Sequence, residues 1–355
     1  MIDSPNSPAL QSLCGELAAV ADGSVWPAKA LQRCAEAGFY RWFVCEEDGG
    51  FGFSSAEIAT GYLALSKANL TVTFILTQRV AALRRIAGCE NEALKRRLLP
   101  RLLSGEQSAT VGISHLTTSR RHLKAPILSM VSDDFGFVAN GTSPWATGAG
   151  GADWVLLGGS MVDDSGEADG REVLFLAPTD DEQLTVREGF DLIALSPSQT
   201  GAVVVQDLTV PPENVVAGPV EQVLTGNGGG AGGLQTSVLA LGLSSAAIEY
   251  IEAETILRGE LIESAQSLRQ QFDDLKTDLF AAAEGDASLS VGEIRSRSNS
   301  LALRATQSAL GVAKGAGFVS GHRVGRWCQE ALFFLVWSCP QEVLQSNLDE
   351  FACNP

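Results

Sequence analysis

The chain has few of the residues on which metal, disulfide and hydrolytic sites usually depend. It has only three histidines and seven cysteines in 355 residues. The cysteines are scattered and odd in number, and none belongs to a Cys-x-x-Cys pair. Such spacing is typical of reduced thiols and not of a zinc site or a disulfide framework. No serine lies in a Gly-x-Ser-x-Gly elbow, so the sequence argues against both metal chemistry and serine hydrolysis.

Positive charge and long apolar runs are also scarce. The 25 lysines and arginines are outnumbered by 42 aspartates and glutamates, which gives a formal net charge of −17. A chain this acidic repels nucleic acid and anionic membrane surfaces. No run of eighteen apolar residues indicates a membrane span, and the N-terminus lacks the basic flank and apolar stretch of a signal peptide. We therefore expect a cytoplasmic protein without nucleic-acid or membrane partners.

Helical signals dominate the two ends of the chain. Ser54-x-x-Glu57 and Ser290-x-x-Glu293 are capping boxes, in which each side chain satisfies a free backbone donor at the start of a helix. Between the first helices, the apolar segment Phe39–Cys45 is expected to be short, buried and extended. From apolar spacing and caps, we expect helices over 28–37, 56–68, 72–87, 90–103, 234–257, 260–283, 290–311 and 324–337.

Strand signals gather in the middle of the chain. Phe135–Ala139 is apolar, Asn140-Gly141 has the residues of a tight hairpin turn, and Trp145-Ala-Thr147 resumes an extended strand. Further strands are expected over 154–158, 173–177 and 201–205, which indicates a small barrel. The ring of Trp145 beside the hydroxyl of Thr147 suits an enclosed heteroaromatic cofactor, since the ring supplies stacking area and the hydroxyl supplies a hydrogen bond. The alternative is that Trp145 is a core residue and Thr147 an ordinary strand residue.

A glycine-rich tract, Gly226–Gly233, separates the strands from the last helices. It lacks the Lys-Ser/Thr pair of a phosphate-binding P-loop, so we interpret it as a hinge. The four helices expected after it have short links, which is typical of an antiparallel bundle. The predicted α+β fold therefore has an N-terminal helical domain at 1–107, a central β-barrel at 108–225 and a C-terminal four-helix bundle at 226–355.

Four patches, in order along the chain, resemble motifs of the acyl-CoA dehydrogenase family. The family motifs are G-F … P-E-E-x-G-G-x-G … E, G-x-E-x-x-K-x-x-x-L-P-x-L-x-x-G-E, N-G-x-K-x-W-I-T and V-P-x-x-N. Because the patches span nearly the whole chain, it is identified as a divergent member of the superfamily. The matching patches are Gly38-Phe39 with Glu47–Gly52 and Glu57, Gly88–Glu106, Asn140–Thr142 with Trp145 and Thr147, and Val210–Asn214.

The resemblance implies an FAD-binding protein with the same three-part fold. It implies a small-molecule substrate such as an acyl-CoA, and a homodimer or homotetramer in which neighbouring subunits complete each FAD site. We expect the subunits to meet through the small-residue face of the helix at 234–257 and through the apolar segment at 331–337.

Several residues are placed around the FAD by the resemblance. The family's T-E-P-x-x-G-S-D loop, which holds the flavin ring and pyrophosphate, corresponds here to the His115–His122 stretch, without its glycine and acidic members. Two arginines in this stretch either bind the pyrophosphate or face solvent. At the adenine end, the family's R-x-x-F-G keeps only its arginine, and either Gln270 or Gln271 matches the glutamine that follows. The expected cofactor-binding residues are Thr117, Thr118, Ser119, Trp145, Thr147, Arg258, Gln270 and Gly315.

The glutamate that removes the substrate's α-proton in most family members is missing. Its position in the family's I-Y-E-G-T segment falls on Ser338, and its alternative position on the first bundle helix falls on Gln235. Neither a hydroxyl nor a carboxamide has a pKa suited to a general base near pH 7. If the alignment slips, Glu330 or Glu342 could supply the carboxylate. We expect Glu330 to pair with an arginine and Glu342 to lie beyond the helix that Pro340 ends.

Three functions remain open at this point. The first is an FAD-dependent oxidoreductase that resembles acyl-CoA dehydrogenases. The second is a flavin monooxygenase on the same fold, which needs no such glutamate because the flavin itself reacts with oxygen. The third is a non-catalytic homologue that no longer dehydrogenates. A visible spectrum of the purified protein separates the third from the other two.

Overall fold

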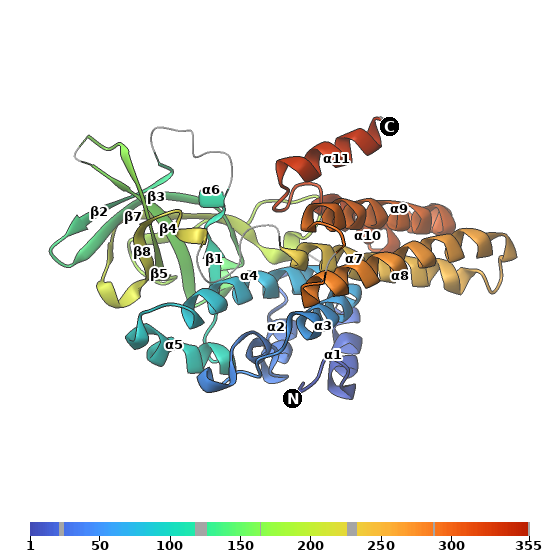
Figure 1. The fold of residues 1–355 in the computed structure, drawn as a ribbon, viewed down its shortest axis with the longest axis horizontal. Coiled ribbons are helices and arrows are strands. Elements are labelled where there is room, and N and C mark those ends of the chain that lie inside the picture. The colour runs from blue at the N-terminus through green and yellow to red at the C-terminus, as the bar shows by residue number, and fades with distance from the viewer. Residues whose placement is uncertain (21–24, 118–125, 164, 226–232, 287, 354–355) are drawn as a thin grey trace.

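The computed structural model describes residues 1–20, 25–117, 126–163, 165–225, 233–286 and 288–353. Helices come first, an eight-stranded sheet follows, and helices end the chain, which confirms the predicted order. Figure 1 shows the sheet at one end of the long axis and the C-terminal helices at the other, with the N-terminal helices below both. The sheet and both groups of helices therefore meet near the middle of the molecule.

The described part of the N-terminal region contains five α-helices around one apolar core. The predicted capping box at Ser54 is confirmed, because Ser54 Oγ accepts a hydrogen bond from Glu57 N at 3.3 Å and Glu57 Oε2 accepts one from Ser54 N at 2.8 Å. Helix α4 is the most buried of the five, and it packs on strand β1. The helices are α1 Pro8–Ala18, α2 Ala28–Glu36, α3 Ser55–Ala68, α4 Leu70–Ala87 and α5 Glu92–Ser104.

The aromatic segment after α2 is helical, and the expectation of an extended segment was wrong. Gly38 has a φ of +83° and turns the chain into a 3-10 helix at Phe39–Phe43. Successive side chains of an extended strand point to opposite faces. The tight helical turn instead buries four of the five side chains in the core. The ring of Trp42 lies so close to Gly61 of α3 that a Cβ at Gly61 would overlap it.

The central sheet is mixed and curls around a core of its own. The strand order is β6-β7-β3-β2-β4-β5-β8, with β1 also paired to β4. Strands β1 and β2 pair with β4 in parallel, whereas the other pairs are antiparallel. Among the pairings of the described residues, none joins the end strands β6 and β8. The strands are β1 Ala109–Gly112, β2 Leu128–Asp133, β3 Gly136–Thr147, β4 Trp154–Val162, β5 Ala168–Pro178, β6 Leu184–Val186, β7 Thr200–Val210 and β8 Val215–Glu221.

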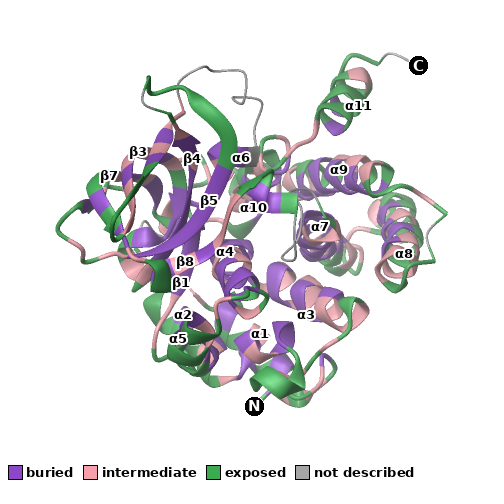
Figure 2. Cartoon of the chain, turned by 60° about the vertical axis from the view of Figure 1, so that its left-hand side comes forward, coloured by how far each residue is buried: buried purple, intermediate pink, exposed green. Residues whose placement is uncertain are grey.

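Alternate side chains of β4 face the two hydrophobic cores of the molecule. Val155 and Leu157 point into the core enclosed by the sheet, whereas Leu156 joins the larger core shared with the helices. This division follows from the period of two in a strand. Figure 2 shows the resulting band of buried residues where the sheet meets α4.

The hairpin predicted at Asn140-Gly141 was wrong, because both residues lie inside β3. The turn comes earlier, at residues 134–135, where Asp133 Oδ1 accepts a hydrogen bond from Phe135 N at 2.9 Å. Asn140 and Gly141 instead form an irregularity in the pairing of β3 with β7. Gly141 has a φ of +135° and lies against the backbone of residue 127. An Asn-Gly pair suits a bulge as well as a turn, since both need unusual backbone angles.

The C-terminal region contains five helices, of which α7, α8, α9 and α10 pack on one another. Gly242 of α7 lies against Ser66 of α3 so closely that a Cβ would overlap its hydroxyl. The small-residue face of α7 is therefore buried within the chain and is not free for a second subunit, contrary to expectation. The helices are α7 Leu234–Glu254, α8 Ile262–Glu284, α9 Val291–Gly317, α10 Arg323–Phe333 and α11 Gln341–Phe351.

Helix α7 also stands out by composition. Within the described part of the chain, it is the helix long and apolar enough to cross a membrane, and 72% of its apolar window is buried inside the protein. This burial is typical of a core helix, which meets other helices on most of its sides.

Helix α10 is shorter than predicted, and a further helix follows it. Residues 334–338 form turns in place of the last predicted helical turn. Arg295 of α9 donates hydrogen bonds to Phe334 O at 3.2 Å and to Trp337 O at 2.9 Å, and this contact binds the turns to α9. Pro340 then precedes the first residue of α11. We predicted that a helix ends before Pro340 but did not predict that another begins after it.

Candidate functional site

Three buried polar atoms near the junction of sheet and helices have no hydrogen-bond partner among the described residues. They are His115 Nδ1, Gln235 Nε2 and Ser237 Oγ. His115 lies on the short helix α6 (Ser114–Thr117) directly after β1, and the other two lie in the first turn of α7. Figure 1 and Figure 2 place α6 on the side of the sheet toward the C-terminal helices. Buried polar groups nearly always have a partner, so these three atoms mark a candidate ligand site.

The chemistry of His115 is set by its surroundings. Its side chain is 7% exposed, and Nε2 lies 2.8 Å from Gly158 O of β4. A carbonyl only accepts, so Nε2 carries the proton. Burial lowers the pKa of His115, although the hydrogen bond to Gly158 opposes the shift. The ring is therefore neutral at pH 7, and Nδ1 is a hydrogen-bond acceptor with no partner in the part of the chain that the structure describes.

Trp145 and Thr147 lie close together on β3 but in different environments. Trp145 is 48% exposed, and its ring meets that of Phe190 edge-on at 4.9 Å between centroids. The interpretation of Trp145 as a core residue was therefore wrong. Thr147 is buried, and its Oγ1 lies 3.0 Å from Thr200 Oγ1. Thr200 Oγ1 also lies 2.8 Å from Ser198 Oγ, so the three hydroxyls form a chain. Since a hydroxyl donates one bond and accepts two, Thr147 Oγ1 at the end of this chain retains capacity for a further polar group.

The residues expected at the adenine end come together only in part. Arg258 Nη1 donates to Val312 O at 2.7 Å, which brings Arg258 near the end of α9 that carries Gly315. A Cβ at Gly315 would meet open space. Gln270 lies about two turns into α8, where its amide donates to Asp274 Oδ1 at 2.8 Å. Gln270 therefore has a local partner on its own helix.

Charge around Arg258 is already partly balanced. Carboxylate oxygens of Glu254 and Glu260 lie 3.7 Å and 3.6 Å from its guanidinium nitrogens. A phosphate would have to compete with these two side chains for the same donors.

Part of the expected pyrophosphate loop cannot be placed. Thr117 is the last residue of α6. Thr118 and Ser119, together with the arginines that follow them, lie outside the described residues.

The two predicted base positions hold Ser338 and Gln235, and neither side chain has a carboxylate. Ser338 is exposed on the turn after α10 and has a φ of +45°. Glu330 is buried, with Oε1 3.7 Å from Arg326 Nε and 3.5 Å from Thr71 Oγ1. This confirms the expected pairing of Glu330 with an arginine. Glu342 lies in the first turn of α11, where its carboxylate covers the α9 backbone at Gly292.

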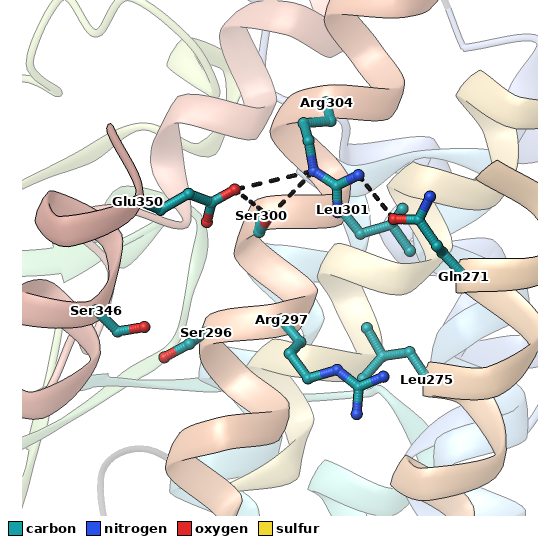
Figure 3. A pocket seen from close by; sticks show the side chains of 9 residues that line it. All are labelled: Gln271, Leu275, Ser296, Arg297, Ser300, Leu301, Arg304, Ser346 and Glu350. Carbon is teal, nitrogen blue, oxygen red and sulfur yellow. Dashed lines mark hydrogen bonds and ion pairs between the residues drawn. The ribbon is translucent and has the colours of Figure 1, made fainter. Parts of the chain in front are cut away.

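A separate polar hollow of about 180 Å³ lies between α8, α9 and α11 (Figure 3). Arg304 Nη1 donates to Gln271 Oε1 at 2.7 Å across it, and Ser300 Oγ donates to Glu350 Oε1 at 2.6 Å. Gln271, the alternative to Gln270 as the expected glutamine, lines this hollow, whereas His115, Gln235 and Ser237 do not. It is therefore distinct from the candidate site marked by His115.

Known proteins resemble this chain in sequence and in fold. Residues 14–106 match the family model of the acyl-CoA dehydrogenase N-terminal domain. The chain is 24% identical over 323 residues to the short-chain specific acyl-CoA dehydrogenase of Megasphaera elsdenii, which covers 84% of this chain and 82% of that protein. Butyryl-CoA dehydrogenase from Megasphaera elsdenii has a similar structure, with a TM-score of 0.78 at 16% identity over 98% of each chain.

A protein with different chemistry is equally similar in fold. Dibenzothiophene monooxygenase TdsC from Paenibacillus sp. A11-2 gives a TM-score of 0.78 at 14% identity, over 98% of this chain and 97% of that chain. One fold commonly hosts several reactions. The choice between them therefore depends on the residues of the site.

Proposed function

The chain belongs to the acyl-CoA dehydrogenase superfamily, and from this we propose that it is a flavin-dependent oxidoreductase that binds FAD. The observation that carries the proposal is the set of unpaired buried atoms at His115, Gln235 and Ser237. The polar edge of a flavin ring presents an N–H donor between two carbonyl acceptors. An acceptor at His115 Nδ1 and donors at Gln235 and Ser237 complement that edge. When bound, the flavin would supply the redox chemistry, and these side chains would orient it.

We propose further that no side chain at Ser338 or Gln235 removes a substrate proton. The lack of a base at these two positions favours oxidation of a small molecule by a route other than base-assisted dehydrogenation of an acyl-CoA. The second candidate is a flavin monooxygenase, and the absence of a carboxylate at both positions is the observation that favours it. Flavin bands in the visible spectrum of the purified protein test the common part of both proposals. Their absence after reconstitution with FAD would leave the non-catalytic homologue.

Replacing Trp145 with Ala is expected to weaken flavin binding roughly two- to tenfold, because an aromatic contact contributes about 0.5–1.5 kcal/mol beyond its buried area. Half of the Trp145 side chain is exposed and free to meet a ligand. Fluorescence titration of flavin-free protein with FAD and with FMN measures the change. Phe135→Ala, at an exposed aromatic on the β2–β3 turn, is the matched control. Equal flavin affinities of the two variants would show that Trp145 does not contact the flavin.

We also propose a homodimer or homotetramer. Ile256, Leu257, Phe318 and Val319 are large, apolar and exposed. The bond from Arg258 to Val312 O holds the ends of α7 and α9, which carry these residues, next to each other. Adjoining exposed apolar side chains are typical of an interface. Light scattering at micromolar concentration should show a dimer or tetramer in the wild type and a smaller species in Leu257→Asp, but not in the control Val25→Asp. A wild-type monomer would contradict the proposal.

A further inference from the structure

Arg295 is a buried cation that forms no salt bridge with any carboxylate of the described residues. Its side chain is 2% exposed, and only Nη2 has hydrogen-bond partners, the carbonyls of Phe334 and Trp337. Nε and Nη1 are buried and have no partner among the described residues. Burial lowers the pKa of Arg295 to about 10, so it remains charged at pH 7. An uncompensated buried charge is costly, and such groups normally pair with an opposite charge.

Two more buried polar atoms, one on α9 and one on α11, have no partner within the described part of the chain. Asn299 is one helical turn further along α9, and both side chains donate to Phe334 O, so they lie side by side. Because the amide of Asn299 faces that carbonyl, its Oδ1 points elsewhere and has no partner. Asn347 of α11 is 3% exposed, and its Nδ2 is also buried without one. The set thus has donors in excess and a single acceptor.

Helix α11 runs beside α9 in the same direction. Glu342, near the start of α11, covers Gly292, and Glu350, near its end, accepts from Ser300. Figure 3 shows part of this arrangement, with Ser346 and Glu350 of α11 beside Ser296 and Ser300 of α9. This register places the buried Asn347 toward α9, between the levels of Gly292 and Ser300.

The start of α11 faces the turn that Arg295 binds. Pro340 precedes the helix and provides no side-chain cap for its first N–H groups. These groups lie at the end of the helix next to Pro340 and favour negative charge. The hydrogen bond from Arg295 Nη2 to Trp337 O, at 2.9 Å, places the guanidinium next to the same turn. A free helix N-terminus and an unpaired buried arginine therefore meet at one place.

We propose that Arg295, Asn299, Asn347 and the N-terminus of α11 form a binding site for a phosphate group. The guanidinium fork binds two phosphate oxygens through Nε and Nη1, and Asn347 Nδ2 donates to a third. Phosphate near pH 7 still carries a proton on part of its population, and that O–H donates to Asn299 Oδ1. Sulfate has no such proton. The site goes beyond the proposed function, because none of its parts depends on a flavin.

The test is calorimetric titration of the full-length protein with inorganic phosphate at constant ionic strength, with and without bound flavin. Saturable binding is expected in both forms, at least tenfold tighter for phosphate than for sulfate or acetate. Arg295→Gln should weaken it at least tenfold. Arg297→Gln, at an exposed arginine of α9 that pairs with Asp278 of α8, should leave it within twofold. No saturable phosphate binding, an adventitious ion bound equally by both variants, or equal affinity for sulfate would overturn the proposal.

Glu342 provides a second variant that leaves Arg295 in place. Its carboxylate lies in the first turn of α11 and competes with an anion for the helix N-terminus. Glu342→Gln should therefore tighten phosphate binding several-fold. Weaker or unchanged binding in this variant would contradict the placement of the site at α11, even if Arg295→Gln failed to fold.

Discussion

Anaerobic mixing with saturated acyl-CoAs of several chain lengths is expected to leave the bound flavin oxidised. The two positions at which relatives carry their base hold Ser338 and Gln235 here. Loss of a positioned base usually lowers the rate by a factor of about 10²–10⁴, which is about 2.7–5.5 kcal/mol of activation free energy. Stopped-flow absorbance at the flavin maximum measures the rate. Slow residual bleaching agrees with this expectation, whereas rapid bleaching does not.

Two substitutions make that experiment decisive. Ser338→Glu introduces a carboxylate on the turn after α10 and should accelerate bleaching, while Ser338→Ala should leave the wild-type result unchanged. If the wild type bleaches rapidly, and Glu342→Gln abolishes this but Ser338→Ala does not, we placed the base wrongly. Glu342 lies in the first turn of α11 against Gly292, so this outcome would also require α11 to move toward the substrate.

Trp42→Ala is expected to lower the free energy of unfolding by about 3–5 kcal/mol. The indole is fully buried, and its Nε1 donates to Ile2 O at 3.3 Å. It also stacks on Phe53 and fills the space above Gly61. Two of the surrounding rings, those of Phe39 and Phe43, belong to the same short 3-10 helix, which limits how far they can move into the cavity. This cost is a large part of the about 5–15 kcal/mol that stabilises a typical domain.

Urea unfolding followed by circular dichroism measures the effect. Trp145→Ala is the matched control, since it removes the same side chain from a half-exposed site on β3. We expect less than about 1 kcal/mol for that variant, because surface substitutions seldom cost more. Similar losses in both variants would show that Trp42 does not hold the N-terminal core together.

Much of the candidate site was open to prediction, and its most informative atoms were not. The motif around Trp145 and Thr147 located a pair on β3, and the motifs in the C-terminal helices located Arg258 and Gly315, which lie near each other. His115 was missed as a site residue. Its sequence neighbourhood gives no sign that Nε2 meets a carbonyl 43 residues away and leaves Nδ1 alone.

Sequence motifs that span only a few residues predicted the structure correctly where local interactions alone determine it. The capping boxes at Ser54 and Ser290 both formed, since each connects residues three apart. Spaced motifs along the whole chain were enough to identify the fold, because they sample every region of it. Asn140-Gly141 shows the limit of such signals, as the same backbone freedom suits a turn or a bulge.

Burial and pairing were decided only by the folded chain. Gly242 of α7 packs against Ser66 of α3. Arg295 of α9 donates hydrogen bonds to the carbonyls of Phe334 and Trp337, which are also distant from it in sequence. No local pattern reveals that the positive charge of Arg295 is buried without an anion, or that the small face of α7 is covered by α3. Desolvation and hydrogen-bond satisfaction depend on all neighbours in space, and those neighbours are brought together only by the tertiary structure.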